Sequence, residues 1–124
     1  MKNIDTNILV RLYLADDQTQ YEKAKSIFVS NKTFFISSYT LLEFVWVLRT
    51  KKYSRLEIYN AVSELIELNN IVVSKKDLIL KALTKYKKGK ADFSDYMILE
   101  DGFDSGAKEL KTFDKKLLNE LNKL

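Results

Sequence analysis

The sequence contains no cysteine, no histidine and no proline, and only three glycines among its 124 residues. Without cysteine, disulfides, thiolate metal sites and cysteine nucleophiles are excluded. Without histidine, serine–histidine hydrolysis, histidine general-base catalysis and histidine-ligated zinc are excluded as well. If the chain is a hydrolase, carboxylates must supply the chemistry, and their oxygen atoms suit hard cations such as Mg²⁺ or Mn²⁺.

Long apolar runs are also missing. No segment approaches the roughly 20 apolar residues needed to span a bilayer. The amino-terminal stretch MKNIDTNILV carries an aspartate at its fifth position and lacks the apolar core of a signal peptide. With 46% apolar residues, the chain can bury one substantial core but is too short for two ordinary domains. We expect a soluble, cytoplasmic protein with a single domain over residues 1–124.

Short apolar segments alternate along the chain with longer helical segments. We predict strands at residues 2–4, 33–37, 70–74 and 108–113. We predict helices from near residue 6, from 38, from the capping-box sequence SRLE at 54–57, and at 76–87, 93–103 and 115–124. This alternation predicts an α/β fold, a three-layer α/β/α sandwich with a mainly parallel central sheet of four to five strands.

Four isolated acids occupy related positions on this map. Asp5 directly follows the first predicted strand, and Asp114 directly follows the fourth. Glu43 lies early in the helix after the second strand, and Asp95 lies early in a helix before the fourth. Because the working site of a parallel α/β fold lies beyond the carboxyl ends of its strands, all four could converge at one edge of the sheet.

Each acid also has a purely structural explanation. Asp5 could cap the helix that begins near Thr6, Glu43 could simply point outward, and Asp114 could cap the last helix or pair with a neighbouring lysine. Asp92 and Asp95 are three residues apart and could share a cation on one helix face. We favour Asp95 as the ligand and Asp92 as the helix cap. We expect the nearby acids to form a solvated helix face: Glu100, Asp101 and Asp104.

Four segments, NIDTNILVRLY, LLEFVWVL, ADFSDYMI and KTFDKKL, occur in the order and approximate spacing of a PIN-domain nuclease. The whole chain resembles the short VapC-type toxins of bacterial toxin–antitoxin systems. The resemblance implies a Mg²⁺- or Mn²⁺-dependent endoribonuclease whose catalytic, metal-binding acids are Asp5, Glu43, Asp95 and Asp114. It places three supporting polar residues beside them: Asn7, Asp92 and Thr112.

The same resemblance implies an RNA substrate, a homodimer and a cognate VapB-like antitoxin. Candidate contact residues are Trp46, Tyr53 and Tyr59, although we expect each to be core or partly core. One departure from the family pattern is the polar sequence AKELK before Asp114, where an apolar strand is usual. Two alternative functions are a catalytically silent PIN-like RNA-binding module and a receiver-type phospho-acceptor domain. The second is disfavoured because Asp16 and Asp17 do not follow a predicted strand.

Basic residues outnumber acidic ones, 21 against 17, for a net charge of +4. Setting aside the four proposed site acids leaves 21 − 13 = +8 over the rest of the chain. Seven lysines lie within Lys75 to Lys90. These lysines could attract a phosphate backbone or could form a solvated helix face, two explanations of about equal weight. The candidate RNA-backbone contacts are Lys85, Lys87, Lys88 and Lys90.

Overall fold

The computed structural model describes residues 1–28 and 32–121. The chain forms two compact units, Met1–Ser74 and Lys75–Leu124, and each is described here by itself. In the part of the chain that the structure describes, no helix is long and apolar enough to cross a membrane.

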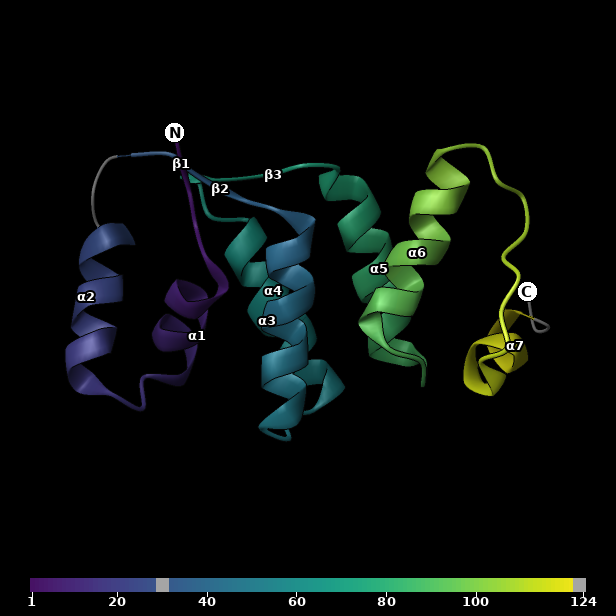
Figure 1. Cartoon of the computed structure of the whole chain (residues 1–124), viewed down its shortest axis with the longest axis horizontal. Helices are drawn as coiled ribbons and strands as arrows, with labels where there is room; N and C mark the ends of the chain where they lie inside the picture. Colours follow the sequence, from purple (N-terminus) through teal and green to yellow (C-terminus); the bar gives the residue numbers. More distant parts are fainter. Residues whose placement is uncertain (29–31, 122–124) are drawn as a thin grey trace. The chain divides into compact units, whose positions relative to one another are not determined.

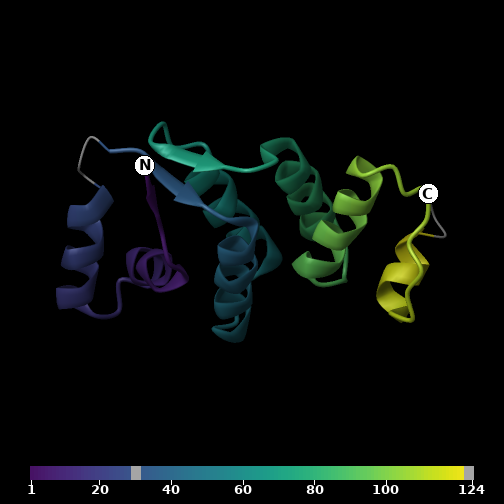
Figure 2. The same ribbon diagram turned by 45° about the horizontal axis from the view of Figure 1, so that its top comes forward.

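The first unit contains a parallel sheet of three strands in the order β1 (Lys2–Asn3), β2 (Phe34–Ile36) and β3 (Ile71–Val73). Lys2 of β1 is in register with Phe34 of β2, and Phe35 of β2 with Val72 of β3. Figures 1 and 2 show the three strands gathered at one end of this unit. The first three predicted strands and their parallel pairing are therefore confirmed.

Four helices complete the first unit: α1 (Thr6–Leu14), α2 (Gln18–Phe28), α3 (Ser38–Thr50) and α4 (Arg55–Ile66). The predicted capping box at the start of α4 is confirmed: the Glu57 N–H donates to Ser54 Oγ at 3.1 Å, and the Ser54 N–H donates to Glu57 Oε1 at 3.0 Å. The centre of the core includes fully buried side chains from β2, α3 and α4: Phe34, Ile36, Leu41, Leu48 and Ile58. Because β1 leads into α1 and β2 leads into α3, both helices begin beyond the carboxyl ends of neighbouring strands.

The second unit contains three helices: α5 (Lys76–Lys88), α6 (Phe93–Asp104) and α7 (Lys115–Leu121). Helices α5 and α6 lie side by side in Figures 1 and 2, and the rings of Tyr86 and Phe93 meet edge to face with centroids 5.9 Å apart. Tyr86 is buried, so it packs within this unit. The predicted last helix extends to residue 124, and its final three residues lie outside the described part of the chain.

The predicted fourth strand at residues 108–113 is wrong, because the described segment from Ala107 to Asp114 has no regular secondary structure. Its sequence explains the difference. A strand inside a parallel sheet needs apolar side chains on both faces, whereas Lys108, Glu109 and Lys111 are charged and exposed. The α/β class and the parallel sheet are confirmed, and helices on both faces of that sheet stay a prediction.

Candidate active site

Asp5 lies between β1 and α1 and is the N-cap of α1. Its backbone is extended, with φ −80° and ψ 153°, and its Oδ1 accepts a hydrogen bond from the Thr6 N–H at 2.7 Å. A carboxylate here is also stabilised by the positive end of the helix dipole. The structure therefore gives Asp5 the capping role that the sequence offered as an alternative, while its side chain stays exposed to solvent.

Thr6 connects Asp5 to the second predicted acid of this unit. Its side-chain hydroxyl donates a hydrogen bond to Glu43 Oε2 at 2.9 Å, across 37 positions of sequence. Thr6 is 6% exposed, so its hydroxyl has little access to water. Thr6 thus donates one hydrogen bond to Asp5 through its backbone N–H and another to Glu43 through its hydroxyl. These two bonds bring the carboxylates close together beyond the ends of β1 and β2.

Glu43 is exposed on the face of α3 opposite its buried residues. Leu41, Val45 and Leu48 recur at helical spacing and pack inward. The outward orientation that the sequence left open is therefore observed, and it is compatible with the bond to Thr6. Thr6 itself was not predicted as a site residue, although its position inside the DTN motif was the available signal. Asn7, the third residue of that motif, is exposed in the first turn of α1.

Asp92 and Asp95 lie together in the second unit, at the start of α6. Asp92 is the N-cap, with φ −77° and ψ 153°, and it forms a capping box with Asp95. The Asp95 carboxylate accepts the backbone N–H of Asp92 at 3.2 Å through Oδ2. The predicted N-cap at Asp92 is confirmed. Asp95 lies in the first turn of α6 and is half-buried.

Asp114 begins the last helix of the second unit. Its Oδ1 accepts a hydrogen bond from the Leu117 N–H at 2.9 Å, so it caps α7. Its own backbone N–H donates to Thr112 Oγ1 at 3.0 Å. Thr112, which the resemblance placed beside the site, therefore fixes the backbone that presents Asp114.

The four predicted acids are divided between the two units. Asp5 and Glu43 belong to Met1–Ser74, whereas Asp95 and Asp114 belong to Lys75–Leu124. Among residues 1–28 and 32–121, no three acidic side chains form a group that could hold a metal ion. Their oxygen donors nevertheless fit a hard divalent cation. Thr6 engages one oxygen of Asp5 and one of Glu43, and each carboxylate has a second oxygen that could act as a ligand.

One acid that we expected in solvent is buried. Glu100 is 6% exposed and forms an ion pair with Lys85, whose ammonium also lies 5.4 Å from the centre of the Phe103 ring. The prediction of a solvated face is wrong for Glu100, because an ionised side chain can be buried when a cation pairs with it. The prediction holds for Asp101 and Asp104, which are exposed and pair with Lys75 at 3.0 and 3.7 Å. The hydrogen bond to Asp101 raises the pKa of Lys75.

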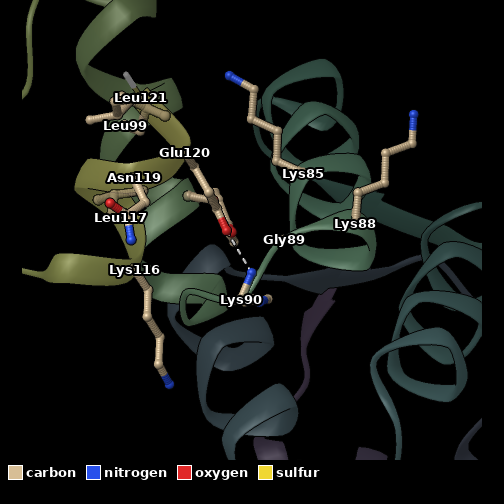
Figure 3. A pocket seen from close by; sticks show the side chains of 11 residues that line it. Lys85, Lys88, Gly89, Lys90, Leu99, Lys116, Leu117, Asn119, Glu120 and Leu121 are labelled. Atoms are coloured by element: carbon tan, nitrogen blue, oxygen red, sulfur yellow. Dashed lines mark hydrogen bonds between the residues drawn. The ribbon is translucent and has the colours of Figure 1, made fainter. Parts of the chain in front are cut away.

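A pocket of about 590 Å³ lies within the second unit, between the α5–α6 pair and α7 (Figure 3). Lysines contribute to its wall from α5, the α5–α6 connection and α7, and leucines supply apolar surface. The Glu120 carboxylate connects these elements by accepting hydrogen bonds from the Lys90 N–H, at 2.6 Å, and from the Tyr96 hydroxyl. The lining lysines are Lys85, Lys88, Lys90 and Lys116, and the leucines are Leu99, Leu117 and Leu121.

The family of this chain is established by its similarity to known proteins. No curated protein matches the chain. Among solved structures, the crystal structure of Mycobacterium tuberculosis VapC20, described as a sarcin–ricin loop cleaving toxin, is similar, with 18% identity over 97% of this chain and 95% of that chain and a TM-score of 0.49. In a scan of protein families, residues 3–124 match the PIN domain. Since that match covers nearly the whole sequence, the chain belongs to the PIN-domain family.

Proposed function

We propose that this protein is an endoribonuclease that depends on Mg²⁺ or Mn²⁺, with Asp5, Glu43, Asp95 and Asp114 as its metal-binding acids. The observation that carries the proposal is the Thr6-linked pair of Asp5 and Glu43 beyond the ends of two parallel strands, in a chain that belongs to the PIN-domain family. With neither histidine nor cysteine in the sequence, carboxylates are the available groups for hydrolysis.

The residues of the first unit have defined tasks in this proposal. Thr6 holds one oxygen of Asp5 and one of Glu43, so the two side chains are oriented before a cation arrives. Their negative charges repel each other, and a divalent cation would offset that repulsion. When bound, Mg²⁺ supplies Lewis acidity, which lowers the pKa of water and offsets the charge that develops at the phosphate.

The residues of the second unit complete the proposed donor set. The capping box orients the Asp95 carboxylate, to which we assign a ligand role, while Asp92 starts the helix that carries it. Thr112 supports Asp114 from the backbone side. Asp92 and Thr112 therefore orient the acids, as Thr6 does in the first unit, and we assign Asn7 the role of a polar neighbour of Asp5.

Cleavage of a mixed RNA substrate with purified protein tests this function. We expect cleavage with Mg²⁺ or Mn²⁺ and none in excess EDTA, and we expect Asp5→Asn and Glu43→Gln to abolish it because each amide removes a ligand charge. Asp16→Asn is the matched control, since Asp16 is an exposed acid paired with Arg11 at 3.1 Å. Full cleavage in EDTA would contradict the metal dependence, and RNA binding without cleavage would favour a silent binding module.

A second pair of variants tests the roles within α6. Asp95→Asn should abolish cleavage because it loses a ligand charge, whereas Asp92→Asn keeps a capping oxygen and should keep much of the activity. Circular dichroism would establish that both variants are folded. Equal inactivity of the two folded variants would place Asp92 among the metal ligands and overturn the division of roles.

We further propose that the protein is the toxin of a VapBC-type system, acting in the cytoplasm as a homodimer that a cognate VapB-like antitoxin neutralises. The four ordered motifs support this, as does the general excess of positive charge for an RNA substrate. Co-expression with the neighbouring upstream reading frame, followed by co-purification and light scattering, is the test. A monomer at high concentration would contradict the dimer, and failure to co-purify would count against the antitoxin.

A further inference from the structure

Helix α3 presents two exposed aromatic side chains on the same face as Glu43. Tyr39 is 77% exposed and Trp46 is 65% exposed. Tyr39 precedes Glu43 by four residues and Trp46 follows it by three. At these spacings side chains are neighbours on a helix surface, so Glu43 lies between the two aromatic residues along the helix.

The exposure of Trp46 corrects our expectation that it would be core or partly core. The buried face of α3 is formed by Leu41, Val45 and Leu48. Helical periodicity places Trp46 nearly opposite these residues. Single exposed aromatic side chains also occur elsewhere, at 38% for Tyr13, 40% for Phe103 and 101% for Phe113. The outer face of α3 differs from these positions because it carries two exposed rings, one before and one after a candidate catalytic acid.

We propose that Tyr39 and Trp46 form a stacking platform for the bases of single-stranded RNA on either side of the phosphate held near Asp5 and Glu43. This inference rests on the proposed function, because the RNA is its substrate. Aromatic rings stack on any base, so the platform supports binding with little sequence preference. It requires unpaired bases, since those within a duplex are already stacked and their faces are covered.

The charge at the centre of this face favours RNA over a second copy of the chain. In a twofold symmetric interface the same surface patch meets itself. An interface centred on this face would bring the Glu43 side chains of both copies together in a desolvated environment, where like charges repel strongly. A nucleic acid has no such conflict, because its bases can contact the two rings while its phosphate approaches the carboxylates together with a cation.

The chain offers a direct test because Trp46 is its only tryptophan. We would titrate the intact protein with a mixed-sequence, single-stranded RNA oligonucleotide in the presence of Ca²⁺, a hard cation that takes carboxylate oxygens, and follow tryptophan fluorescence. Stacking on the indole should quench it. In parallel, the anisotropy of a labelled oligonucleotide should show that Trp46→Ala and Tyr39→Ala each raise Kd at least about fivefold, whereas Trp46→Phe and Tyr39→Phe should restore most of the affinity.

The matched control is Leu56→Ala, which removes an apolar side chain that is 52% exposed on α4. It should leave Kd unchanged. Urea unfolding followed by circular dichroism would show that the variants are folded. An unchanged fluorescence on saturation, or an unchanged Kd in both alanine variants, would overturn the proposal. So would a loss of binding that accompanies a change from dimer to monomer, because the face would then belong to a second copy.

This experiment is independent of catalysis. Because fluorescence and anisotropy report binding and not cleavage, absence of cleavage in the assay above would not affect its result. A duplex of the same oligonucleotide should bind at least several-fold more weakly than the single strand. Equal affinity for both forms would show that the bases do not stack on the protein and would also overturn the platform.

Discussion

At the scale of single residues, the candidate site depends on the buried threonine between two carboxylates. The sequence offered helix capping and metal binding as competing explanations of Asp5, yet the structure shows that capping leaves one oxygen available. The same holds for Glu43, which points outward and still reaches Thr6. Position along the chain was enough to place both acids beyond neighbouring strands, but it could not predict Thr6, because the contact depends on how α1 and α3 pack.

Replacing Thr6 therefore tests whether orientation of the acids matters. Thr6→Val keeps the shape and removes the hydroxyl, so we expect the free energy of unfolding to fall by about 1 kcal/mol. We also expect a higher Mg²⁺ concentration for half-maximal cleavage, because Glu43 loses its hydrogen bond. Thr6→Ser restores the hydroxyl and should restore the Mg²⁺ dependence. Identical Mg²⁺ titrations for Thr6→Val and the native protein would contradict the orienting role.

At the scale of elements, most helix boundaries could be predicted, since capping sequences such as SRLE and changes in apolar spacing are local signals. The packing of α5 against α6 could not. The buried Glu100 lies in a sequence, LEDGFD, that looks solvated, and its partner Lys85 is 15 residues away on another helix. The prediction of a strand at residues 108–113 was wrong for a related reason. The position of a segment in the order of strands and helices does not guarantee that it has the apolar side chains that a sheet interior needs.

The Lys85–Glu100 pair leads to a prediction about stability. Lys85→Met should lower the free energy of unfolding by about 1–3 kcal/mol, because it leaves the buried Glu100 carboxylate without its cation. The double variant Lys85→Met, Glu100→Leu should recover much of this loss, since no charge then remains buried. Lys81→Met is the control, because Lys81 is exposed on the same helix. The measurement is urea unfolding, and equal midpoints for Lys85→Met and the native protein would contradict the prediction.

At the scale of the whole molecule, charge is the property that the sequence predicts most directly. A net charge of +4 favours a polyanionic partner. Whether all four acids meet depends on packing between distant parts of the chain and not on composition. A single domain over residues 1–124 therefore stays a prediction, as does the convergence of the acids at one edge of the sheet.

Salt dependence of RNA binding tests the electrostatic part of this argument. Each lysine–phosphate contact should contribute about −0.7 to the slope of log K against log salt for a single strand. Lys88 and Lys90 are exposed at the second-unit pocket, so Lys88→Ala and Lys90→Ala should each make the slope shallower by about that amount. Lys23→Ala, an exposed lysine on α2, should leave it unchanged. Equal slopes for all three variants would contradict RNA contact at the pocket.

The missing fourth strand also has a consequence for the lifetime of the protein. Ala107 to Phe113 has no regular secondary structure, and its Lys108 and Lys111 are exposed. Backbone of this kind fits readily into a protease cleft, whereas lysines within α5 require the helix to unfold first. Trypsin should therefore make its first nick after Lys108 or Lys111, which mass spectrometry of early digestion products would show. Such a cut would separate Asp114 from Asp95 along the chain, so we expect cleavage of one peptide bond in an exposed segment to end the proposed nuclease activity without unfolding the remainder.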